Sequence, residues 1–448
     1  MAGAWLLERM AQWRERPAMI WRGSPVTYEW LLDRVSFWRD QLPCRGVRPG
    51  QVVAVCGDYS PNAIAILLGL TECAAIMVPL TESLEASRTD LMQAAEVQAI
   101  FSFDDGDRAR LEIRDGILKN SLIRTLVERG DPGLILFSSG STGKPKGSLH
   151  NLARFLLKFQ IPKAALRTIA LPPLDHVAGL DTLFYTLSSG GTLITLSDRR
   201  PDAVCEAIQR YRAELLPASA TFLNLLLLSR AGERFELTSL RIVAYGSDVM
   251  PEATLAYLRE ALPHTQFVQK YGTTELGSPR TRSKENGSLW MKIDSEGVET
   301  KVIDGILWIR TPSAMLGYLN APSPFTEDGW FNTGDAVEVV GEYIRILGRK
   351  SDIINVGGNK VYPAEVESVL HLMDGVEDVA VSGEPNPITG QMVTARAAIT
   401  TGESLGEFRS RMWTFCKDKL TSYKIPQKVL LVDKLSYGER FKKMRREF

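Results

Sequence analysis

A loop rich in glycine, hydroxyl and lysine side chains follows a short apolar run at residues 134–137. Such a loop can hold a polyphosphate. Glycines let backbone N–H groups approach an anion, while hydroxyl and ammonium groups add donors and positive charge. The glycines are Gly140, Gly143 and Gly147, the hydroxyl residues are Ser138, Ser139, Ser141 and Thr142, and the lysines are Lys144 and Lys146. We predict that this loop cradles phosphate groups.

The loop is not the P-loop of the common NTPases. That motif needs a serine or threonine directly after its glycine–lysine pair, whereas Gly143 and Lys144 are followed by Pro145. The apolar run before the loop predicts a buried strand, and the spacing from Leu149 onward predicts a helix. The expected local structure is therefore strand, loop and helix.

A second group of polar residues lies at positions 269–275, in the sequence Gln-Lys-Tyr-Gly-Thr-Thr-Glu. An aromatic ring here offers a flat face to a base, two hydroxyls can reach a phosphate, and a carboxylate can hold Mg²⁺ through oxygen. The residues are Tyr271, Gly272, Thr273, Thr274 and Glu275.

Length and composition limit the classes of protein that fit. The chain has 448 residues, with 53 basic and 53 acidic side chains. A length beyond about 250–300 residues predicts more than one domain, and the balanced charge gives no sign of nucleic acid as a partner. Five scattered cysteines without C-x-x-C spacing argue against a disulfide framework or a zinc site, and fit a reducing cytoplasm. No signal peptide is evident, and no apolar run reaches the roughly 18–20 residues of a transmembrane helix.

Alternating patterns predict the elements that position these groups. Residues 51–56 have the apolar run of a buried strand, and residues 62–70 have helical spacing. Helical and strand-like segments alternate in this way through the N-terminal part, and again after residue 363. Alternation of this kind predicts an α/β sheet with helical crossovers.

Both polar groups resemble motifs of the adenylate-forming superfamily, which includes acyl-CoA synthetases, the adenylation domains of peptide synthetases and luciferases. Residues 138–147, Ser-Ser-Gly-Ser-Thr-Gly-Lys-Pro-Lys-Gly, resemble its signature loop, and residues 271–275 resemble its Tyr-Gly-x-Thr-Glu motif. Further stretches at residues 329–335, 348–367 and 422–426 follow in the family's order. The resemblance implies a large N-terminal α/β, AMP-binding domain at residues 1–347, a hinge at 348–352 and a small α+β lid domain at 353–448.

The resemblance also implies an acid pocket. His176 would lie beside the acyl group, and Val177 stands where peptide-synthetase domains have an aspartate that holds the substrate amine. An α-amino acid substrate is therefore disfavoured. Tyr245 and Gly246 match a turn at the adenine and acyl pockets, and together with Val177 and the leucines at 225–228 they indicate an apolar pocket for a fatty or aromatic acid.

The remaining implied roles concern the nucleotide and the lid. Asp335 would accept hydrogen bonds from the ribose diol, and Arg349 would hold the same sugar. Ser351 replaces the usual Asp or Lys at the hinge, and Lys442 has the spacing of the family's final catalytic lysine in an altered loop. The residues expected to act in catalysis are Lys442, Thr274 and Glu275, with Glu275 also the ligand of Mg²⁺.

The activity implied is that of an ATP-dependent acid–thiol ligase. A small-molecule carboxylic acid would attack ATP to form acyl-AMP and pyrophosphate, and the acyl group would then form a thioester with CoA. One alternative acceptor is the phosphopantetheine of an acyl carrier protein. A non-catalytic nucleotide-binding relative would fit the altered final loop, and a luciferase-like oxygenase is a further alternative that no sequence feature requires.

Overall fold

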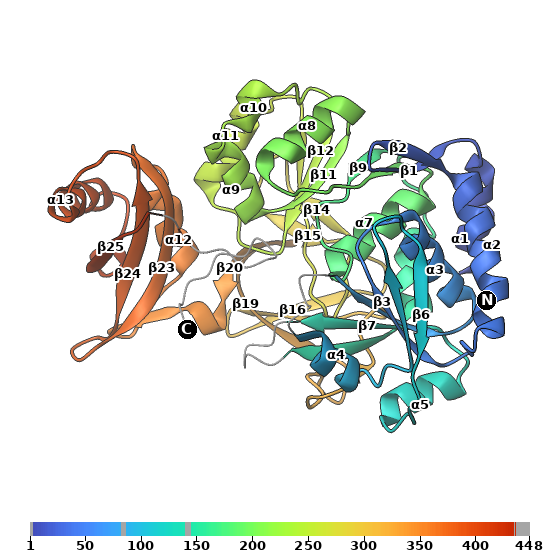
Figure 1. Cartoon of the computed structure of the whole chain (residues 1–448). Coiled ribbons are helices and arrows are strands. Elements are labelled where there is room, and N and C mark those ends of the chain that lie inside the picture. Colours follow the sequence, from blue (N-terminus) through green and yellow to red (C-terminus); the bar gives the residue numbers. More distant parts are fainter. Residues whose placement is uncertain (1–2, 82–86, 139–144, 434, 436–448) are drawn as a thin grey trace.

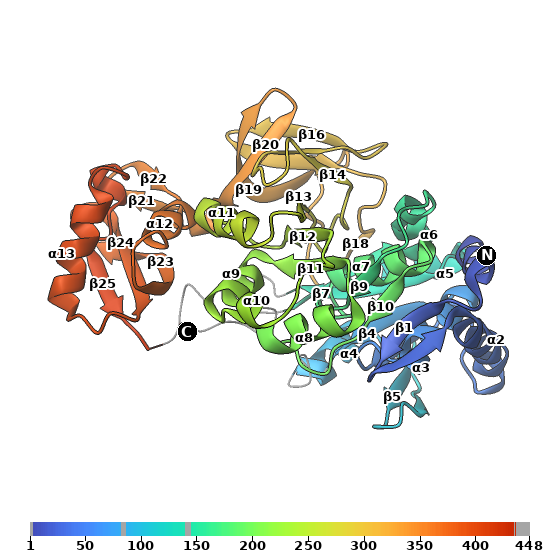
Figure 2. The same cartoon turned by 90° about the horizontal axis from the view of Figure 1, so that it is seen from above.

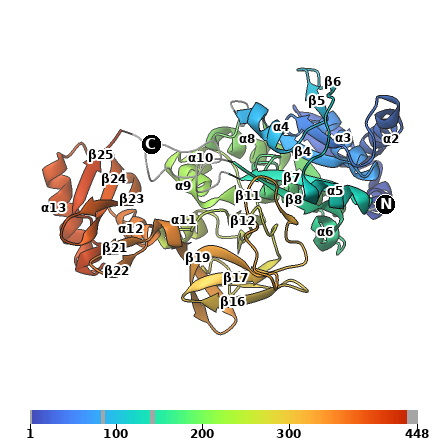
Figure 3. The same cartoon turned by 90° about the horizontal axis from the view of Figure 1, so that it is seen from below.

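The computed structural model describes residues 3–81, 87–138, 145–433 and 435. Three β-sheets with their helices form a large N-terminal body, and a fourth sheet with two helices forms a small C-terminal body. The small body lies to one side of the large one, at the opposite end from the N-terminus (Figure 1, Figure 2 and Figure 3).

The first seven-stranded sheet has the order β18-β8-β7-β4-β3-β5-β6. Its inner strand β3 is apolar on both faces: Val52 and Ala54 belong to one core, and Val53 and Val55 belong to another. This pattern is typical of a parallel strand covered on both sides, and β3 pairs in parallel with β4 and β5. The strands are β3 (Val52–Cys56), β4 (Ile76–Leu80), β5 (Ala99–Phe103), β6 (Ala109–Ile113), β7 (Gly133–Ser138), β8 (Lys146–Asn151) and β18 (Gly317–Tyr318).

The second seven-stranded sheet has the order β13-β12-β11-β9-β10-β1-β2, and all its pairs except β1–β2 are parallel. The carboxyl ends of its parallel strands therefore meet at one edge, which is where open α/β sheets bind ligands. The strands are β1 (Pro17–Trp21), β2 (Ser24–Thr27), β9 (Arg167–Ile169), β10 (Thr192–Ile194), β11 (Leu215–Ser219), β12 (Ile242–Gly246) and β13 (Gln266–Gln269).

A core shared by both seven-stranded sheets contains the helices α3 (Pro61–Glu72) and α7 (Val177–Ser188). Almost every residue of α3 is buried, as expected for a helix packed on more than one side. Other helices cover the opposite faces: α4 and α5 pack on the first sheet, and α8 to α11 pack on the second. The other helices of the large body are α1 (Ala4–Met10), α2 (Tyr28–Cys44), α4 (Arg88–Ala94), α5 (Ser121–Glu128), α6 (Leu152–Leu156), α8 (Pro201–Tyr211), α9 (Ala220–Leu228), α10 (Ala231–Arg234) and α11 (Glu252–Ala261).

The third sheet is antiparallel, with the order β14-β15-β20-β19-β17-β16. Its long central pair, β19 with β20, sets Asp335 directly opposite Arg349. The strands are β14 (Thr281–Ser283), β15 (Met291–Ile293), β16 (Glu299–Ile303), β17 (Ile306–Arg310), β19 (Phe331–Val340) and β20 (Tyr343–Arg349).

The small body has its own hydrophobic core, formed by its sheet and helices. Its sheet has the order β22-β21-β24-β23, with β25 paired to β24. A short 3-10 turn, Lys350–Asp352, connects it to β20. Its elements are β21 (Ile354–Val356), β22 (Asn359–Val361), α12 (Pro363–Leu370), β23 (Val376–Asn386), β24 (Gly390–Ile399), α13 (Leu405–Cys416) and β25 (Lys428–Leu431).

Candidate active site

The phosphate loop predicted from the sequence joins two antiparallel strands, so the helix expected directly after it is wrong. Ser138 at the end of β7 pairs with Lys146 at the start of β8, and α6 begins only at Leu152. Strand β8 is buried along nearly its whole length, and apolar spacing cannot distinguish such a strand from a buried helix. Six predicted loop residues lie outside the described part of the chain: Ser139, Gly140, Ser141, Thr142, Gly143 and Lys144.

Tyr271, Asp335 and Arg349 form one hydrogen-bonded group. The Tyr271 hydroxyl donates to Asp335 Oδ2 at 2.6 Å, and Arg349 Nε lies 2.9 Å from Asp335 Oδ1. Burial, reinforced by the Asp335 carboxylate, raises the pKa of Tyr271 well above its usual value. Arg349 also donates to the Thr333 carbonyl at 2.6 Å, which orients its guanidinium. The sequence separates these residues widely, and the register of β19 and β20 brings them together.

Glu275 is held by a tyrosine from a distant segment of the chain. The hydroxyl of Tyr318, on β18, donates to Glu275 Oε1 at 2.6 Å. Burial, and then the Glu275 charge, raise the pKa of Tyr318. On the other side of the same chain segment, buried His150 on β8 donates from Nε2 to the Thr274 carbonyl at 2.8 Å, and burial lowers the pKa of His150 to about 4. Two strands of the first sheet thus position Thr274 and Glu275.

Gly272 and Thr273 shape the turn before Glu275. The Thr273 hydroxyl accepts a hydrogen bond from the Leu276 backbone N–H at 3.2 Å. A Cβ atom at Gly272 would lie 2.8 Å from the Gly277 carbonyl oxygen, so only glycine allows this close approach.

A cavity of about 240 Å³ opens at the carboxyl edge of the second sheet. His176, Val177 and Gly246, which the sequence analysis assigned to the acid pocket, line this cavity, and its binding of an acid stays a prediction. His176 is the N-cap of α7, and its Nδ1 accepts a hydrogen bond from the Ala178 backbone N–H at 3.2 Å, so a neutral ring carries its proton on Nε2. Much of the wall is apolar, with residues Leu171, Pro172, Pro173, Ala178, Pro217, Ala218, Phe222, Ala244 and Val268 among those lining it.

Tyr245 was expected in this pocket, and that expectation is wrong. Successive side chains of a strand point to opposite faces, so Ala244 and Gly246 of β12 face the cavity while Tyr245 points the other way. Tyr245 is buried in the core beneath the outer helices, where its hydroxyl lies 3.4 Å from the Ser288 carbonyl. From α9, Phe222 rather than the leucines at 225–228 reaches the cavity wall.

A second cavity, of about 250 Å³, adjoins the first. Tyr271 and Gly272 line both, while Asp335 and Arg349 line the second only. Ala364, at the start of α12, also borders this cavity, so the small body contributes to its wall. An apolar compartment therefore meets a compartment that carries a paired carboxylate and guanidinium.

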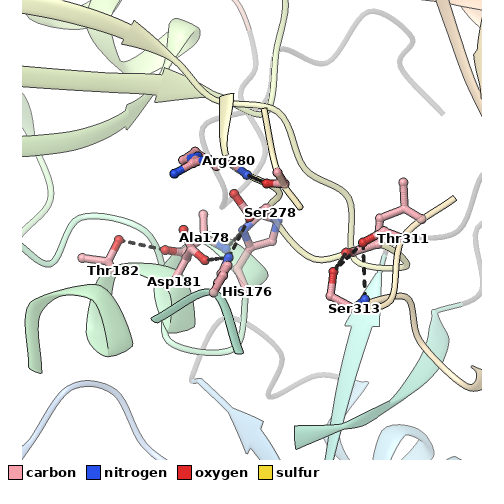
Figure 4. A network of polar contacts seen from close by, with 11 residues as sticks. His176, Ala178, Asp181, Thr182, Ser278, Arg280, Thr311 and Ser313 are labelled. Atoms are coloured by element: carbon pink, nitrogen blue, oxygen red, sulfur yellow. Dashed lines mark hydrogen bonds and ion pairs between the residues drawn. The ribbon is translucent and has the colours of Figure 1, made fainter. Parts of the chain in front are cut away.

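Three charged residues near the first cavity were not singled out from the sequence. Lys270 and Asp181 line it, and the Lys158 ammonium forms an ion pair with Asp181. Lys270 directly precedes the motif residue Tyr271. Because side chains alternate along a strand, its position next to the motif could have indicated that it lies at the site. Figure 4 shows His176, Asp181 and Ser278 gathered in one place, close to Arg280.

The structure describes the predicted hinge residue, whereas the predicted catalytic lysine lies outside the described residues. Ser351 lies in the exposed 3-10 turn after β20, where its hydroxyl donates to Asp352 at 3.1 Å. Its role as a hinge stays a prediction. Lys442 lies outside the described residues. Within the described ranges, no helix is both long and apolar enough to cross a membrane.

Comparison with known proteins places this architecture in a family. The protein-family model described as AMP-binding enzyme matches residues 6–319. The family model described as AMP-binding enzyme C-terminal domain matches residues 365–442. The chain therefore belongs to the AMP-binding enzyme family, and the resemblance found in the sequence is confirmed.

Related proteins match over nearly their whole length. A feruloyl-CoA synthase from Amycolatopsis sp is 29% identical, over 97% of this chain and 95% of that protein. A 2-succinylbenzoate–CoA ligase from Bacillus subtilis (strain 168) is 26% identical, over 96% of this chain and 94% of that protein.

Solved structures are similar in fold. The anthranilate CoA ligase AuaEII in complex with anthranoyl-AMP has a TM-score of 0.84 at 21% identity, covering 98% of this chain and 95% of that one. The o-succinylbenzoate CoA synthetase of Bacillus subtilis in complex with its acyl-adenylate has a TM-score of 0.76 at 24% identity, covering 98% and 96%. The predicted fold class, a large N-terminal α/β domain with a small C-terminal domain, is confirmed.

Proposed function

We propose that this protein is an AMP-forming acid–thiol ligase, which activates a carboxylic acid with ATP and transfers the acyl group to CoA. The observation that carries the proposal is the pair of adjoining cavities. The first is largely apolar, the second presents Asp335 and Arg349, and Tyr271 with Gly272 separates them. An acid in the first cavity and a nucleotide in the second would meet at that boundary.

The second cavity suits the nucleoside. The carboxylate of Asp335 can accept hydrogen bonds from both hydroxyls of a ribose, and the ion pair with Arg349 orients it. Tyr271, whose hydroxyl donates to Asp335, would offer its ring to the base. The loop from Ser138 to Lys146 would hold the pyrophosphate portion of ATP.

The first step forms a P–O bond and breaks another. A carboxylate oxygen of the acid attacks the α-phosphorus, and the bond to the β-phosphate oxygen breaks, so pyrophosphate leaves with the electron pair. Both reactants are anions, and catalysis therefore depends on positioning and positive charge rather than on a general base. Lys442 would bridge the carboxylate and the α-phosphate, and the loop lysines Lys144 and Lys146 would hold the leaving pyrophosphate.

The donors at Glu275 fit the Mg²⁺ that accompanies ATP. This ion is usually bound by one or two carboxylates together with phosphates and waters. Glu275 supplies one carboxylate, oriented by the Tyr318 hydroxyl, and the Thr274 hydroxyl is next to it in the chain. When bound, Mg²⁺ would neutralise phosphate charge. The protein holds this segment in place through Tyr318, which contacts Glu275, and His150, which contacts the Thr274 carbonyl.

The second step transfers the acyl group to sulfur. A thiol attacks the acyl carbon, AMP leaves with its carboxylate-derived oxygen, and the thiol proton goes to solvent. A rotation near Ser351 would withdraw Lys442 and admit the thiol. CoA is the acceptor we favour, because the relatives described above are a feruloyl-CoA synthase and a 2-succinylbenzoate–CoA ligase. The pantetheine of a carrier protein is the alternative.

The apolar wall of the first cavity favours an acid with an aromatic or other apolar body. Val177 lines this cavity and, by the resemblance to peptide-synthetase domains, stands where an aspartate would hold an α-amine, which disfavours amino acids. The named substrates of the relatives, ferulate and 2-succinylbenzoate, are aromatic acids.

The test is pyrophosphate release from ATP and Mg²⁺ across aromatic, fatty, dicarboxylic and amino acids. We expect release with aromatic acids, an acyl hydroxamate when hydroxylamine replaces the thiol, and an acyl-CoA mass when CoA is added. Lys442→Ala should slow release by about a hundredfold or more, and Lys443→Ala serves as its matched control.

Each other result has a defined meaning. ATP binding without pyrophosphate release for any acid would reject the ligase and favour a non-catalytic nucleotide-binding protein. A thioester formed only on a carrier protein would reject CoA. A defect confined to Lys443→Ala would move the catalytic role to that neighbour.

A further inference from the structure

Lys270 is the cation that lines the acid cavity, and the fold directs its side chain there. It follows β13 directly, two residues after Val268, which also lines this cavity. Its backbone N–H donates to the Tyr245 carbonyl at 2.7 Å, which continues the pairing with β12. A Cβ atom built on Gly246 would lie 3.4 Å from the Lys270 Cβ, so positions 246 and 270 share one face.

The charged groups around Lys270 lie on the acid side. Burial lowers the pKa of Lys270, Asp181 raises it, and Lys158, Lys163 and Arg280 lower it further. Lys270 lines the acid cavity and also borders the nucleotide cavity.

Lys270 forms no ion pair within the described residues, although the nearby Asp181 charge favours its charged form. Across the part of the chain that the structure describes, no carboxylate lies within 4.0 Å of its ammonium. Asp181 is the acidic side chain that lines the same cavity near it, and Lys158 pairs with that carboxylate. Lys158 is held in this arrangement by a second bond, to the Ser278 carbonyl at 2.7 Å. Among the described residues, the largely apolar cavity thus presents the Lys270 ammonium without an ion-pair partner, on a side chain that is exposed to solvent in the absence of a ligand.

This arrangement is unfavourable for a purely apolar acid. An acid that fills the cavity would remove water from the Lys270 ammonium, and burying a charged group without a partner is costly. A substrate that carries its own negative charge at this place would instead gain a charge-assisted hydrogen bond in a water-poor setting.

We infer that Lys270 recognises a second anionic group on the substrate, so that the preferred acid is a dicarboxylic acid with an apolar body. The inference rests on the proposed ligase function and narrows its substrate class. One carboxylate reacts at the boundary near Tyr271, and the other pairs with Lys270 within the acid cavity. The second carboxylate is bound and not transformed.

The experiment compares matched acids that differ only by a second carboxylate: benzoate with phthalate, phenylpropanoate with its ring-carboxylated analogue, and hexanoate with adipate. Pyrophosphate release gives kcat/KM for each acid, and the readout is the ratio of the dicarboxylic to the monocarboxylic member. In the wild type we expect at least one pair whose ratio exceeds one. Lys270→Met should lower that ratio by about tenfold to a hundredfold, as expected for losing a hydrogen bond between charged groups.

Two further variants separate recognition from structure. Lys270→Arg keeps the charge and should retain part of the ratio. Lys163→Met removes a nearby positive charge that does not line the cavity, and its ratio should stay close to that of the wild type. A wild type that prefers the monocarboxylic member of every pair would overturn the inference, and so would a Lys270→Met variant that lowers both members equally.

Failure of the ligase function is distinguished by direct binding. If no acid releases pyrophosphate, the proposed function fails, and calorimetric titration of the same acid pairs into wild type and Lys270→Met decides the inference. Tighter binding of the dicarboxylic member that depends on Lys270 supports it. Equal binding of both members, or no binding of either, refutes it.

Discussion

The buried histidine beside the Thr274–Glu275 segment should make the stability of the large body depend on pH. Burial lowers the pKa of His150 from 6.5 to about 4. Between these values the unfolded chain binds a proton that the folded chain does not, so stability is lost as the pH falls. Linkage gives about 2 kcal/mol of lost stability between pH 7.5 and pH 5, and about 3 kcal/mol when the pH has fallen through the folded pKa.

The assay is urea unfolding at pH 7.5 and pH 5, without nucleotide or magnesium, for wild type and His150→Gln. Eight of the nine tryptophans lie before residue 348, so their fluorescence reports mainly on the large body. Glutamine can still donate to the Thr274 carbonyl but does not titrate. The wild type should lose about 2 kcal/mol more than the variant between the two pH values.

His264→Gln is the matched control, because His264 is an exposed histidine in the same body. It should keep the wild-type pH dependence. If His150→Gln and wild type lose the same stability between pH 7.5 and pH 5, then His150 does not stay neutral in the folded protein. The argument that its ring donates to the Thr274 carbonyl as a fixed neutral tautomer would then fail.

Three further predictions concern contacts around the two cavities. Tyr318→Phe removes the hydroxyl that holds Glu275, so kcat/KM for ATP should fall about tenfold to a hundredfold with little change in the urea midpoint; an unchanged kcat/KM would contradict the positioning role. Asp335→Asn should weaken binding of ATP but not of 2′,3′-dideoxy-ATP, as measured by calorimetry, and an equal loss for both nucleotides would argue against ribose recognition. Gly246→Ala places a Cβ atom 2.7 Å from the Lys270 carbonyl oxygen, so it should lower the free energy of unfolding by about 1–3 kcal/mol and raise KM for the acid. A variant as stable as the wild type in thermal unfolding would show that the backbone at this strand end can move to relieve the contact.

Strand positions with apolar residues on both faces could be predicted from the sequence. The run at residues 52–56 indicated a buried strand, and the structure places alternate residues of it in two different cores. The same property explains the error after the phosphate loop. Strand β8 is also buried on both faces, and its apolar spacing did not distinguish it from the helix that starts three residues after Leu149.

Sequence motifs predicted which segments form the site, but not which face of a strand each side chain occupies. A motif places Tyr245 and Gly246 near a ligand, yet neighbouring strand residues point in opposite directions, and only the packing of β12 decides that Gly246 faces the cavity. Contacts between distant segments were equally out of reach. The pairing of Tyr318 with Glu275 depends on β18 joining β8, which no local pattern in the sequence indicates.

The end of β13 explains how acid and nucleotide can be bound at a fixed separation. Three consecutive residues lie where the two cavities meet: Gln269 lines the second cavity, while Lys270 and Tyr271 line both, and the Tyr271 hydroxyl donates to Asp335. Because these residues share one strand end, the distance between the acid and the ribose is set by covalent geometry rather than by flexible loops. Under the inferred role of Lys270, we expect a different side chain at position 270 to change the preferred acid while Asp335 and Arg349 stay in place. This separation explains how one chain segment can combine shared adenylation chemistry with a selectivity of its own.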